Sequence, residues 1–288
     1  MSLRQRLAED RILVAPGVYD GLTALIAAEA GFEALYLSGA AVAYTRLGRP
    51  DIGLSTMGEM AETMALIRDR VDRPVIIDAD TGFGNALNAQ RTMRVYERAG
   101  ANALQIEDQV SPKRCGHLAD KALISAEEMV GKIQAMADAR RSAETLIIAR
   151  TDAIAVEGIA AALDRAERYA EAGADALFVE APRSGDDLAR IAATFGGRIP
   201  LLANMVEGGT TPMRTAEDLQ RAGFSIVIFP GGIVRALAYA ARDYYASLAA
   251  AGSNTPFADR MFDFAGLNDL IGTDEMLAAG KRYDGSKT

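Results

Sequence analysis

Eight short apolar runs, separated by longer amphipathic stretches, set the strongest constraint on the fold of this chain. Each run is rich in Leu or in β-branched residues, which is typical of strands buried on both faces of a parallel sheet. The runs cover residues 12–16, 34–38, 75–80, 103–108, 145–150, 176–180, 200–204 and 226–230. This alternation predicts a repeated strand–helix unit.

The stretches between the runs share a recurring helix end. Residues 86–97 and 159–171 are predicted to be helical, and Gly100 and Gly173 follow them in the sequence Ala-Gly-Ala, which is typical of a helix end. Ala-Gly-Phe occurs in the same way at Gly31 and Gly223. Eight such units predict an α/β fold, a (β/α)8 TIM-type barrel. A doubly wound open sheet also alternates, but eight strands without a linker favour closure.

The pattern changes near the C-terminus. After about residue 255 the chain carries apolar residues at helical spacing, and residues 285–288 are expected to fray. We therefore expect one barrel domain over residues 1–288, with a C-terminal helical extension over about 255–288. With its apolar positions, this extension could cover the barrel of its own subunit or be exchanged with a neighbouring subunit.

Composition excludes several classes of function. The net charge of −8, without a basic stripe, argues against a nucleic-acid partner. A single cysteine excludes an internal disulfide and fits a reducing compartment, and a single histidine excludes a zinc site of clustered His and Cys. No signal peptide is expected, and no apolar run approaches the roughly 18 residues of a membrane span. We expect a cytoplasmic protein that acts on a small molecule, with no membrane partner.

Polar side chains follow almost every predicted strand, where a barrel of this kind carries its active site. They are Ser38, Asp78, Asp80, Glu107, Asp108, Arg150, Asp152, Glu180, Asn204 and Glu207. An N-cap role for the next helix is the alternative interpretation, and it suits Asp108 and Asp152 best. That role does not account for so many polar residues at one rim.

Three of these residues predict a metal site. Asp78 and Asp80 are two residues apart in a predicted strand, so they should share a face and form a carboxylate cluster with Glu107. Clustered carboxylates repel one another unless a cation lies among them. Oxygen ligands favour Mg²⁺ or Mn²⁺, held in part through water.

Other residues predict sites for anionic groups. Arg150 is suited to grip a carboxylate, while Ser38 and the small residues Gly39 and Ala40 offer a hydroxyl and backbone N–H groups. Asn204 adds a neutral donor. Together with the metal, these groups favour a small, multiply charged 2-oxo or 2-hydroxy acid.

Two glycine-rich segments have features of phosphate-binding sites. Residues 82–84 lack the third glycine of a dinucleotide fingerprint and are rejected. Gly231 and Gly232 follow the eighth strand, where many barrels bind phosphate, so a phosphorylated substrate stays an alternative.

The only cysteine and the only histidine lie in one segment, residues 113–117, Lys-Arg-Cys-Gly-His. No helix or strand pattern would bury it, so we expect an exposed thiol among cations. Such surroundings lower a thiol pKa and suit an acid, a nucleophile or a ligand. The alternative is an inert loop.

The chain resembles the isocitrate lyase/phosphoenolpyruvate mutase superfamily over roughly residues 10–270, and most closely its short lyases acting on 2-methylisocitrate or 2,3-dimethylmalate. The resemblance rests on residues 36–39 (YLSG), 78–84 (DADTGFG), 106–109 (IEDQ), 113–117 (KRCGH) and 149–153 (ARTDA). Residues 204–212 are similar to a loop of the plant oxaloacetate-hydrolysing branch.

The resemblance implies a role for each matching residue. Asp80 and Glu107, with Asp78 close by, belong to the Mg²⁺ site. Cys115 matches the general acid, on a loop that closes over the site, and Lys113 and His117 beside it tune the thiol and attract an anion. The remaining matches are to the substrate site: Ser38, Gly39, Ala40, Asp51, Gly116, Arg150, Asn204 and Pro230, with Glu180 beside the reacting end and Tyr36 as a candidate base. A homotetramer is implied as well.

The implied function is a Mg²⁺-dependent carbon–carbon lyase that releases pyruvate from a 2-methyl-substituted 2-hydroxy di- or tricarboxylate. The first alternative is oxaloacetate hydrolysis or decarboxylation, but that branch usually has Ser where Pro230 stands here. A phosphonomutase is a further alternative, which Cys115 argues against because that reaction leaves no carbanion to protonate. A non-catalytic acid-binding barrel is the last.

Overall fold

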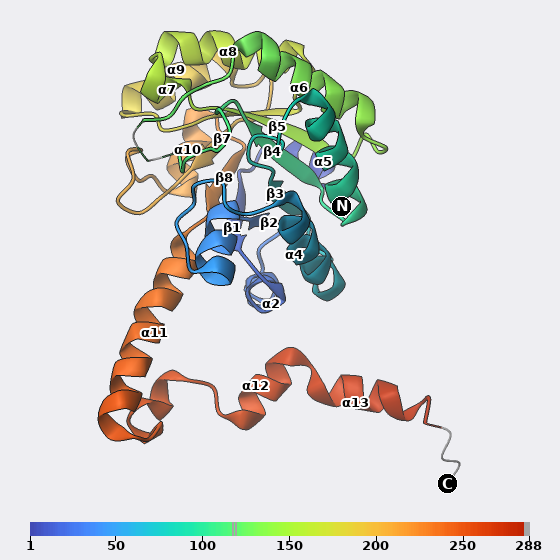
Figure 1. Ribbon diagram of the computed structural model, residues 1–288, viewed down its shortest axis with the longest axis vertical. Coiled ribbons are helices and arrows are strands. Elements are labelled where there is room, and N and C mark those ends of the chain that lie inside the picture. The colour runs from blue at the N-terminus through green and yellow to red at the C-terminus, as the bar shows by residue number, and fades with distance from the viewer. Residues whose placement is uncertain (117, 119, 285–288) are drawn as a thin grey trace. The chain divides into compact units, whose positions relative to one another are not determined.

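The computed structural model describes residues 1–116, 118 and 120–284, and its centre is a ring of eight parallel strands (Figure 1). The strands are β1 (Leu13–Val18), β2 (Leu35–Leu37), β3 (Val75–Asp78), β4 (Ala103–Glu107), β5 (Leu146–Thr151), β6 (Ala176–Val179), β7 (Leu202–Asn204) and β8 (Ile226–Phe229). Their order in the sheet is β6-β5-β4-β3-β2-β1-β8-β7. A parallel bridge between Leu177 in β6 and Leu201 beside β7 joins the two ends. The predicted barrel is therefore confirmed.

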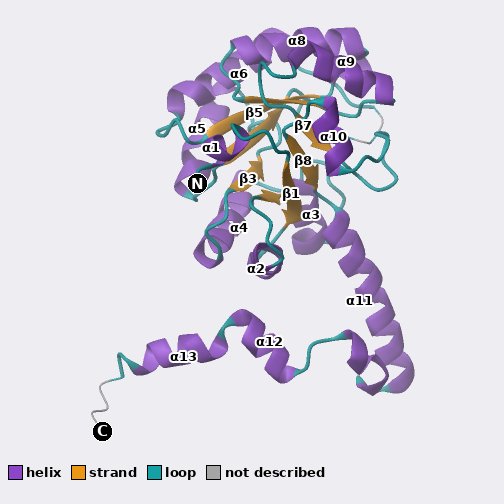
Figure 2. Cartoon of the chain, turned by 180° about the vertical axis from the view of Figure 1, so that it is seen from behind, coloured by secondary structure: helices purple, strands orange, loops and turns teal. Residues whose placement is uncertain are grey.

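Helices surround the strands, as Figure 2 shows by colour. They are α1 (Leu3–Leu7), α2 (Gly21–Glu29), α3 (Gly39–Val42), a π-helix (Ala43–Leu47), α4 (Met57–Arg70), α5 (Ala86–Arg98), α6 (Ala126–Ala139), α7 (Ala153–Val156), α8 (Ile159–Glu171), α9 (Gly185–Phe195) and α10 (Ala216–Ala222). After β8 the chain continues into α11 (Gly232–Ala251). A 3₁₀ helix (Thr255–Arg260), α12 (Phe264–Ile271) and α13 (Thr273–Lys281) follow.

The repeated helix end is confirmed by backbone conformation. Gly31, Gly100, Gly173 and Gly223, which follow α2, α5, α8 and α10, all have φ between 90° and 107°. Only glycine adopts this region without strain, so the chain can leave each helix and enter the next strand. The local sequence thus sets four of the corners of the barrel.

Both faces of the strands are buried, as their unbroken apolar character predicts. One apolar cluster fills the barrel and includes Leu13, Ile76, Ile148 and Phe178. A second, larger cluster lies between the strands and the helices. The rigid strands therefore present their carboxyl ends as a fixed rim.

Several predicted strands run one or two residues further in sequence than the observed ones, and one difference matters for the site. β3 ends at Asp78, and Asp80 lies beyond it with a φ of 45°, in the left-handed region. The expectation that Asp78 and Asp80 share a face because they are two apart in one strand is wrong. A turn after the strand, which strand periodicity does not predict, sets the position of Asp80.

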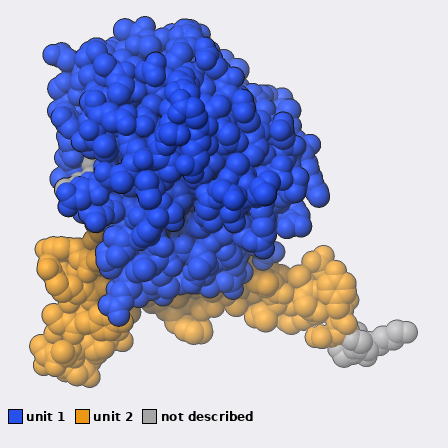
Figure 3. Space-filling model, turned by 45° about the horizontal axis from the view of Figure 1, so that its top comes forward, with its two compact units in different colours: residues 1–234 blue, residues 235–288 orange. Residues whose placement is uncertain are grey.

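The chain divides into two compact units, Met1–Val234 and Arg235–Thr288, which Figure 3 colours separately. The first holds the barrel. The second holds most of α11, the 3₁₀ helix, α12 and α13, and its apolar side chains include Phe264, which is 87% exposed, and Met276, which is 73% exposed. The expected fraying of residues 285–288 lies outside the described residues. Over the described part of the chain, no helix is both long and apolar enough to span a membrane.

Candidate active site

The predicted carboxylate cluster lies buried at the ends of β3 and β4. Asp78 ends β3 and Glu107 ends β4, and Asp80 follows β3 by two residues. The backbone N–H of Asp80 donates to Asp78 Oδ1 at 3.1 Å, which draws the turn back onto the strand end. All three residues are at most 7% exposed. Water therefore contributes little to stabilising their charge.

A neutral pair behind the cluster orients Asp78. Gln105 in β4 is fully buried, and its Nε2 donates to Asp78 Oδ1 at 3.4 Å. The hydroxyl of Tyr36 in β2 donates to Gln105 Oε1 at 2.5 Å. Burial, and then the charge of Asp78, raises the pKa of Tyr36, so the phenol keeps its proton. The sequence analysis missed Gln105, although an amide within the apolar run Ala-Leu-Gln-Ile-Glu was the signal for it.

Burial also governs the charge state of the cluster. Burial raises the pKa of Asp80 to about 6, although Lys113 beside it favours the charged form. Burial likewise raises the pKa of Glu107, with Arg150 acting against it. Lys113 Nζ lies 2.8 Å from Asp80 Oδ1 and 2.6 Å from Asp51 Oδ1. The cluster therefore favours a proton or a cation.

The donor set fits a hard divalent cation. Asp80 Oδ1 and Glu107 Oε2 are buried, and within the described residues their contacts are ion pairs, with Lys113 at 2.8 Å and with Arg150 at 3.3 Å respectively. Within the described part of the chain, no group of three or more His, Cys, Asp or Glu side chains is arranged to hold a metal ion directly. Buried oxygen donors that are not gathered into such a group match an ion held largely through water.

Arg150 is fixed on two sides at the end of β5. Its Nε donates to Asp152 Oδ2 at 2.8 Å, and its Nη2 donates to Asp152 Oδ1 at 3.0 Å. Its Nη1 lies 3.3 Å from Glu107 Oε2, and the guanidinium stacks over the ring of Phe178. Burial alone would raise the pKa of Asp152, but Arg150 and Lys121 outweigh it and lower the pKa to about 2.

The N-cap interpretation of Asp108 and Asp152 is wrong. Asp152 precedes α7 but makes no side-chain cap to it, because its carboxylate binds Arg150 instead. Asp108 Oδ1 accepts from the backbone N–H of Asp152 at 2.9 Å. Asp108 Oδ2 accepts from Thr151 Oγ1 at 2.7 Å and from the Tyr169 hydroxyl at 2.8 Å. Asp108 therefore supports the strand end that carries Arg150.

The segment that carries Cys115 packs into the rim, which corrects the expectation of an exposed loop. Lys113 and Gly116 are buried and Cys115 is half-buried, while Arg114 is exposed. The backbone N–H of Cys115 donates to the Asp51 carbonyl at 3.2 Å, and Arg114 N donates to Gln109 Oε1 at 3.0 Å. Lys113 can be buried because its ion pairs with Asp51 and Asp80 compensate its charge, which the sequence pattern did not predict. His117 lies outside the described residues.

Gly116 brings this segment onto Arg150. A Cβ at Gly116 would lie 2.3 Å from Arg150 Nη2 and 2.9 Å from Glu180 Cγ, so only glycine fits. The Gly116 carbonyl accepts a hydrogen bond from Lys121 Nζ, which also donates to Asp152 Oδ1 at 2.8 Å. The sequence analysis missed Lys121, and no local pattern pointed to it.

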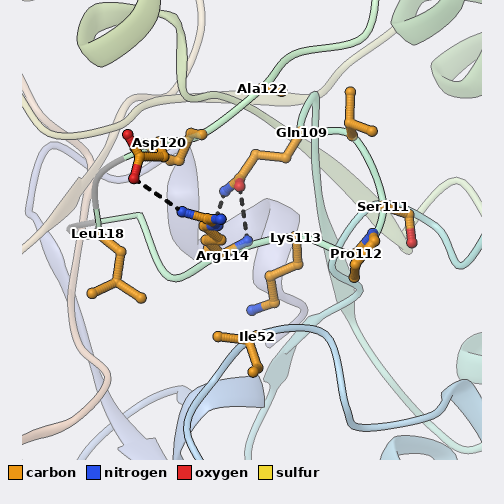
Figure 4. Close-up of a pocket in the computed structure, with 11 residues that line it drawn as sticks. Ile52, Gln109, Ser111, Pro112, Lys113, Arg114, Leu118, Asp120 and Ala122 are labelled. Atoms are coloured by element: carbon orange, nitrogen blue, oxygen red, sulfur yellow. Dashed lines mark hydrogen bonds and ion pairs between the residues drawn. The ribbon is translucent and has the colours of Figure 1, made fainter.

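A cavity of about 670 Å³ borders the same segment (Figure 4). Its described lining consists of Ile52, Gln109, Val110, Ser111, Pro112, Lys113, Arg114, Leu118, Asp120, Lys121 and Ala122. In the close-up, Gln109 reaches the backbone of Arg114, and the Arg114 side chain turns toward Asp120. The lining combines apolar side chains with lysine and arginine.

The remaining predicted substrate residues lie at or near strand ends around the rim. Ser38 is buried and caps α3, because its Oγ accepts from the backbone N–H of Ala41 at 3.2 Å. Gly39 lies against Asp78, since a Cβ there would lie 3.0 Å from Asp78 Oδ2, and Ala40 is half-buried beside it. These residues join the end of β2 to the carboxylate cluster.

On the other side of the rim, Asn204 at the end of β7 points its Nδ2 at Glu180, 3.3 Å and 3.4 Å from the two carboxylate oxygens. Asn204 Oδ1 is buried and accepts no hydrogen bond from the described residues. Pro230 follows β8 and lies against β1, where a Cβ at Gly17 would be 2.2 Å from the Pro230 carbonyl oxygen. Glu207 approaches the start of α11, because a Cβ at Gly232 would lie 3.3 Å from Glu207 Oε1.

The chain matches a family model and is similar to several relatives. The model described as phosphoenolpyruvate phosphomutase matches residues 3–249. A 2,3-dimethylmalate lyase of Eubacterium barkeri is 41% identical over 98% of this chain and 96% of its own length. A 2-methylisocitrate lyase of Aeropyrum pernix is 49% identical over 94% of this chain and 86% of its own length.

Solved structures resemble the whole chain. A 2,3-dimethylmalate lyase superposes with a TM-score of 0.92 at 36% identity, covering 99% of this chain and 96% of that one. An oxaloacetate acetylhydrolase with 3,3-difluorooxalacetate gives 0.91 at 32% identity, covering 100% and 97%. A phosphonopyruvate hydrolase with oxalate and Mg²⁺ gives 0.88 at 31% identity, covering 98% and 97%.

Proposed function

Because this chain is an enzyme of the isocitrate lyase/phosphoenolpyruvate mutase superfamily, we propose that it is a Mg²⁺-dependent carbon–carbon lyase. Its substrate is a 2-methyl-substituted 2-hydroxy di- or tricarboxylate of the 2-methylisocitrate or 2,3-dimethylmalate type, and its products are pyruvate and a second carboxylate. One observation carries the proposal. The segment with the only thiol packs onto Arg150 and Glu180 through Gly116 and reaches the carboxylate cluster through Lys113.

Asp78, Asp80 and Glu107 are proposed to hold Mg²⁺, or Mn²⁺ in its place. The buried oxygens and raised pKa values of Asp80 and Glu107 favour a cation there, and the relative with oxalate and Mg²⁺ shares the fold. When bound, the ion polarises the 2-hydroxyl group and the neighbouring carboxylate of the substrate. The carboxylates must lose their protons to hold it.

Arg150 is proposed to bind a substrate carboxylate. Asp152 fixes its guanidinium in one orientation, so little conformational entropy is lost when an anion arrives. Ser38, Gly39, Ala40 and Asn204 supply further donors around the rim. Asp51 positions Lys113 and Cys115, because it contacts one through its carboxylate and the other through its carbonyl.

Cys115 is proposed to be the general acid. When the C2–C3 bond breaks, its electron pair stays on the departing carbon, and the hydroxyl oxygen, having lost its proton to a base, becomes the carbonyl of pyruvate. The Cys115 Sγ–H then protonates the carbanion. Tyr36 is assigned to orienting Gln105 and Asp78, since its phenol donates and its raised pKa keeps it protonated. Lys113 and His117 are proposed to assist as cationic neighbours.

A coupled assay with lactate dehydrogenase tests the reaction directly. Purified enzyme with Mg²⁺ should release pyruvate from 2-methylisocitrate or from 2,3-dimethylmalate, read as oxidation of NADH. Absence of pyruvate with both substrates would reject the assignment.

Oxaloacetate hydrolysis is the second candidate, because an oxaloacetate acetylhydrolase superposes on the whole chain. Pro230 argues against it, since the resembling branch usually has Ser there and proline offers no hydroxyl. Loss of oxaloacetate absorbance with formation of oxalate and acetate would favour this activity. Phosphonate chemistry is disfavoured further, because the Glu207 carboxylate approaches Gly232, where a phosphate would bind.

A homotetramer is proposed for the assembly. The described part of the C-terminal unit exposes several large apolar side chains, among them Phe262, Phe264, Met276, Leu277 and Tyr283. Exposed apolar groups of this kind mark contact surfaces. Light scattering that gives four times the mass of the chain would support this assembly, and a monomer would reject it.

A further inference from the structure

Lys121 is a buried cation between two parts of the rim that are distant in sequence. Its side chain is 1% exposed. Its Nζ donates to Asp152 Oδ1 at 2.8 Å and to the Gly116 carbonyl at 2.5 Å. A buried ammonium is costly unless its hydrogens are bonded, and here two fixed acceptors satisfy it.

Through Asp152, the contact of Lys121 extends to Arg150. The same carboxylate holds Arg150 through two hydrogen bonds, so one anion receives two cations from different segments. Asp152 is itself held through its backbone by Asp108, which also binds Thr151 and Tyr169. The acceptor of Lys121 is therefore a rigid point of the barrel.

Gly116 is the other acceptor, and it immediately follows Cys115. Its Cα lies against Arg150 and Glu180, so a small shift of its peptide changes how the thiol faces the rim. The Gly116 carbonyl accepts its hydrogen bond from Lys121 Nζ. The ammonium thus links the thiol segment to the arginine through a single carboxylate.

We propose that Lys121 is a positioning residue that fixes Gly116, and with it Cys115, against Arg150 by way of Asp152. The hydrogen bonds of Lys121 go to Gly116 and Asp152 and to none of the proposed metal carboxylates, so its role is geometric. The inference about placement stands whichever acid the enzyme cleaves. Only its effect on turnover rests on the proposed function.

Alkylation of the single cysteine measures this placement without turnover. Because Cys115 is the only thiol, the rate of iodoacetamide labelling reports on it alone. Lys121→Met keeps a long unbranched side chain but removes the ammonium group. We expect labelling of the unliganded protein to become about tenfold faster, the factor that corresponds to about 1.4 kcal/mol for one hydrogen bond to a charged group.

Lys132→Met is the matched control. Lys132 is also a buried lysine, and its Nζ donates to a backbone carbonyl, that of Thr81, at 3.2 Å. This variant should lose stability in a similar way but leave the labelling rate of Cys115 unchanged. A wild-type labelling rate in Lys121→Met, or an equal acceleration in Lys132→Met, would overturn the proposal.

Lys121→Gln covers the case in which the methionine variant does not fold. Its neutral amide tolerates burial but is too short to reach both acceptors, so labelling should still accelerate severalfold. A folded glutamine variant that labels at the wild-type rate rejects the proposal.

If the lyase reaction is confirmed, the same variants should affect kcat and KM differently. Asp152 still holds Arg150 in Lys121→Met, so KM should stay near the wild-type value while kcat falls about tenfold. A rise in KM with unchanged kcat would contradict the assigned role. If the wild-type protein releases no pyruvate, the labelling experiment still decides the placement.

Discussion

The backbone of Gly116 lies directly on the guanidinium of Arg150, so that a Cβ at residue 116 would stand 2.3 Å from Arg150 Nη2. Arg150 cannot move aside, because Asp152 binds it twice and Glu107 lies on its other side. The position of the thiol segment therefore depends on the position of Arg150.

Gly116→Ala should lower kcat by about tenfold to a hundredfold, because the added methyl group displaces the peptide beside Cys115. Steady-state pyruvate release measures this effect. Gly131→Ala is the control, since no atom lies within 4 Å of its new Cβ in α6, and it should keep full activity with a gain of about 0.5–1 kcal/mol in stability. Equal activity in the two variants would contradict the close packing at Gly116.

Cys115→Ser should reduce kcat by about a hundredfold or more, because a hydroxyl is a much weaker acid than a thiol at neutral pH. Binding of Mg²⁺ and oxalate, measured by calorimetry, should change little, since the thiol is not among the proposed ligands. An unchanged rate would remove Cys115 from the reaction.

Removal of divalent ions should abolish activity, because the buried carboxylates at Asp78, Asp80 and Glu107 then lack the cation they favour. Dialysis against EDTA followed by addition of Mg²⁺ or Mn²⁺ tests this reversibly. Glu107→Gln should weaken Mg²⁺ binding in a calorimetric titration by roughly tenfold or more. Full activity in the metal-free enzyme would rule out the metal-dependent reaction.

Stability should fall at acid pH in a way that depends on Asp152. Its pKa is about 2 in the folded protein, below the ordinary value of 3.8, because Arg150 and Lys121 outweigh the effect of burial. Such a group stabilises the fold fully above pH 3.8, and this contribution, about 2 kcal/mol, is lost as the pH falls from there toward 2. Urea unfolding between pH 5 and pH 3 should show a steeper loss in the wild type than in Asp152→Asn. Parallel curves would show that Asp152 is not the group responsible.

The barrel was predictable because local sequence sets its repeating parts. Buried strands need unbroken apolar runs, and the glycines after α2, α5, α8 and α10 need positive φ, so both leave a local signature. The predicted polar strand ends do surround one rim. The turn that carries Asp80 left no such signature, because strand periodicity stops at Asp78.

The contacts within the site were harder to predict, because they join residues far apart in sequence. Lys113 is buried only because Asp51 and Asp80 meet it, and nothing in residues 113–117 indicates those partners. Lys121 meets Asp152 in the same way. Gln105 is the exception, since a lone amide in an apolar strand points to a buried hydrogen bond.

The order of the strands places two groups of residues on different parts of the rim. The carboxylates lie at the ends of β3 and β4, whereas Asn204 and Pro230 lie at the ends of β7 and β8, with β1 and β2 between the two groups. Mutations on the β7–β8 side can change the space around a bound substrate and leave the carboxylates at β3 and β4 unchanged. A mutant library restricted to residues 204–212 and 230 is therefore a suitable start for evolving activity on other acid substrates.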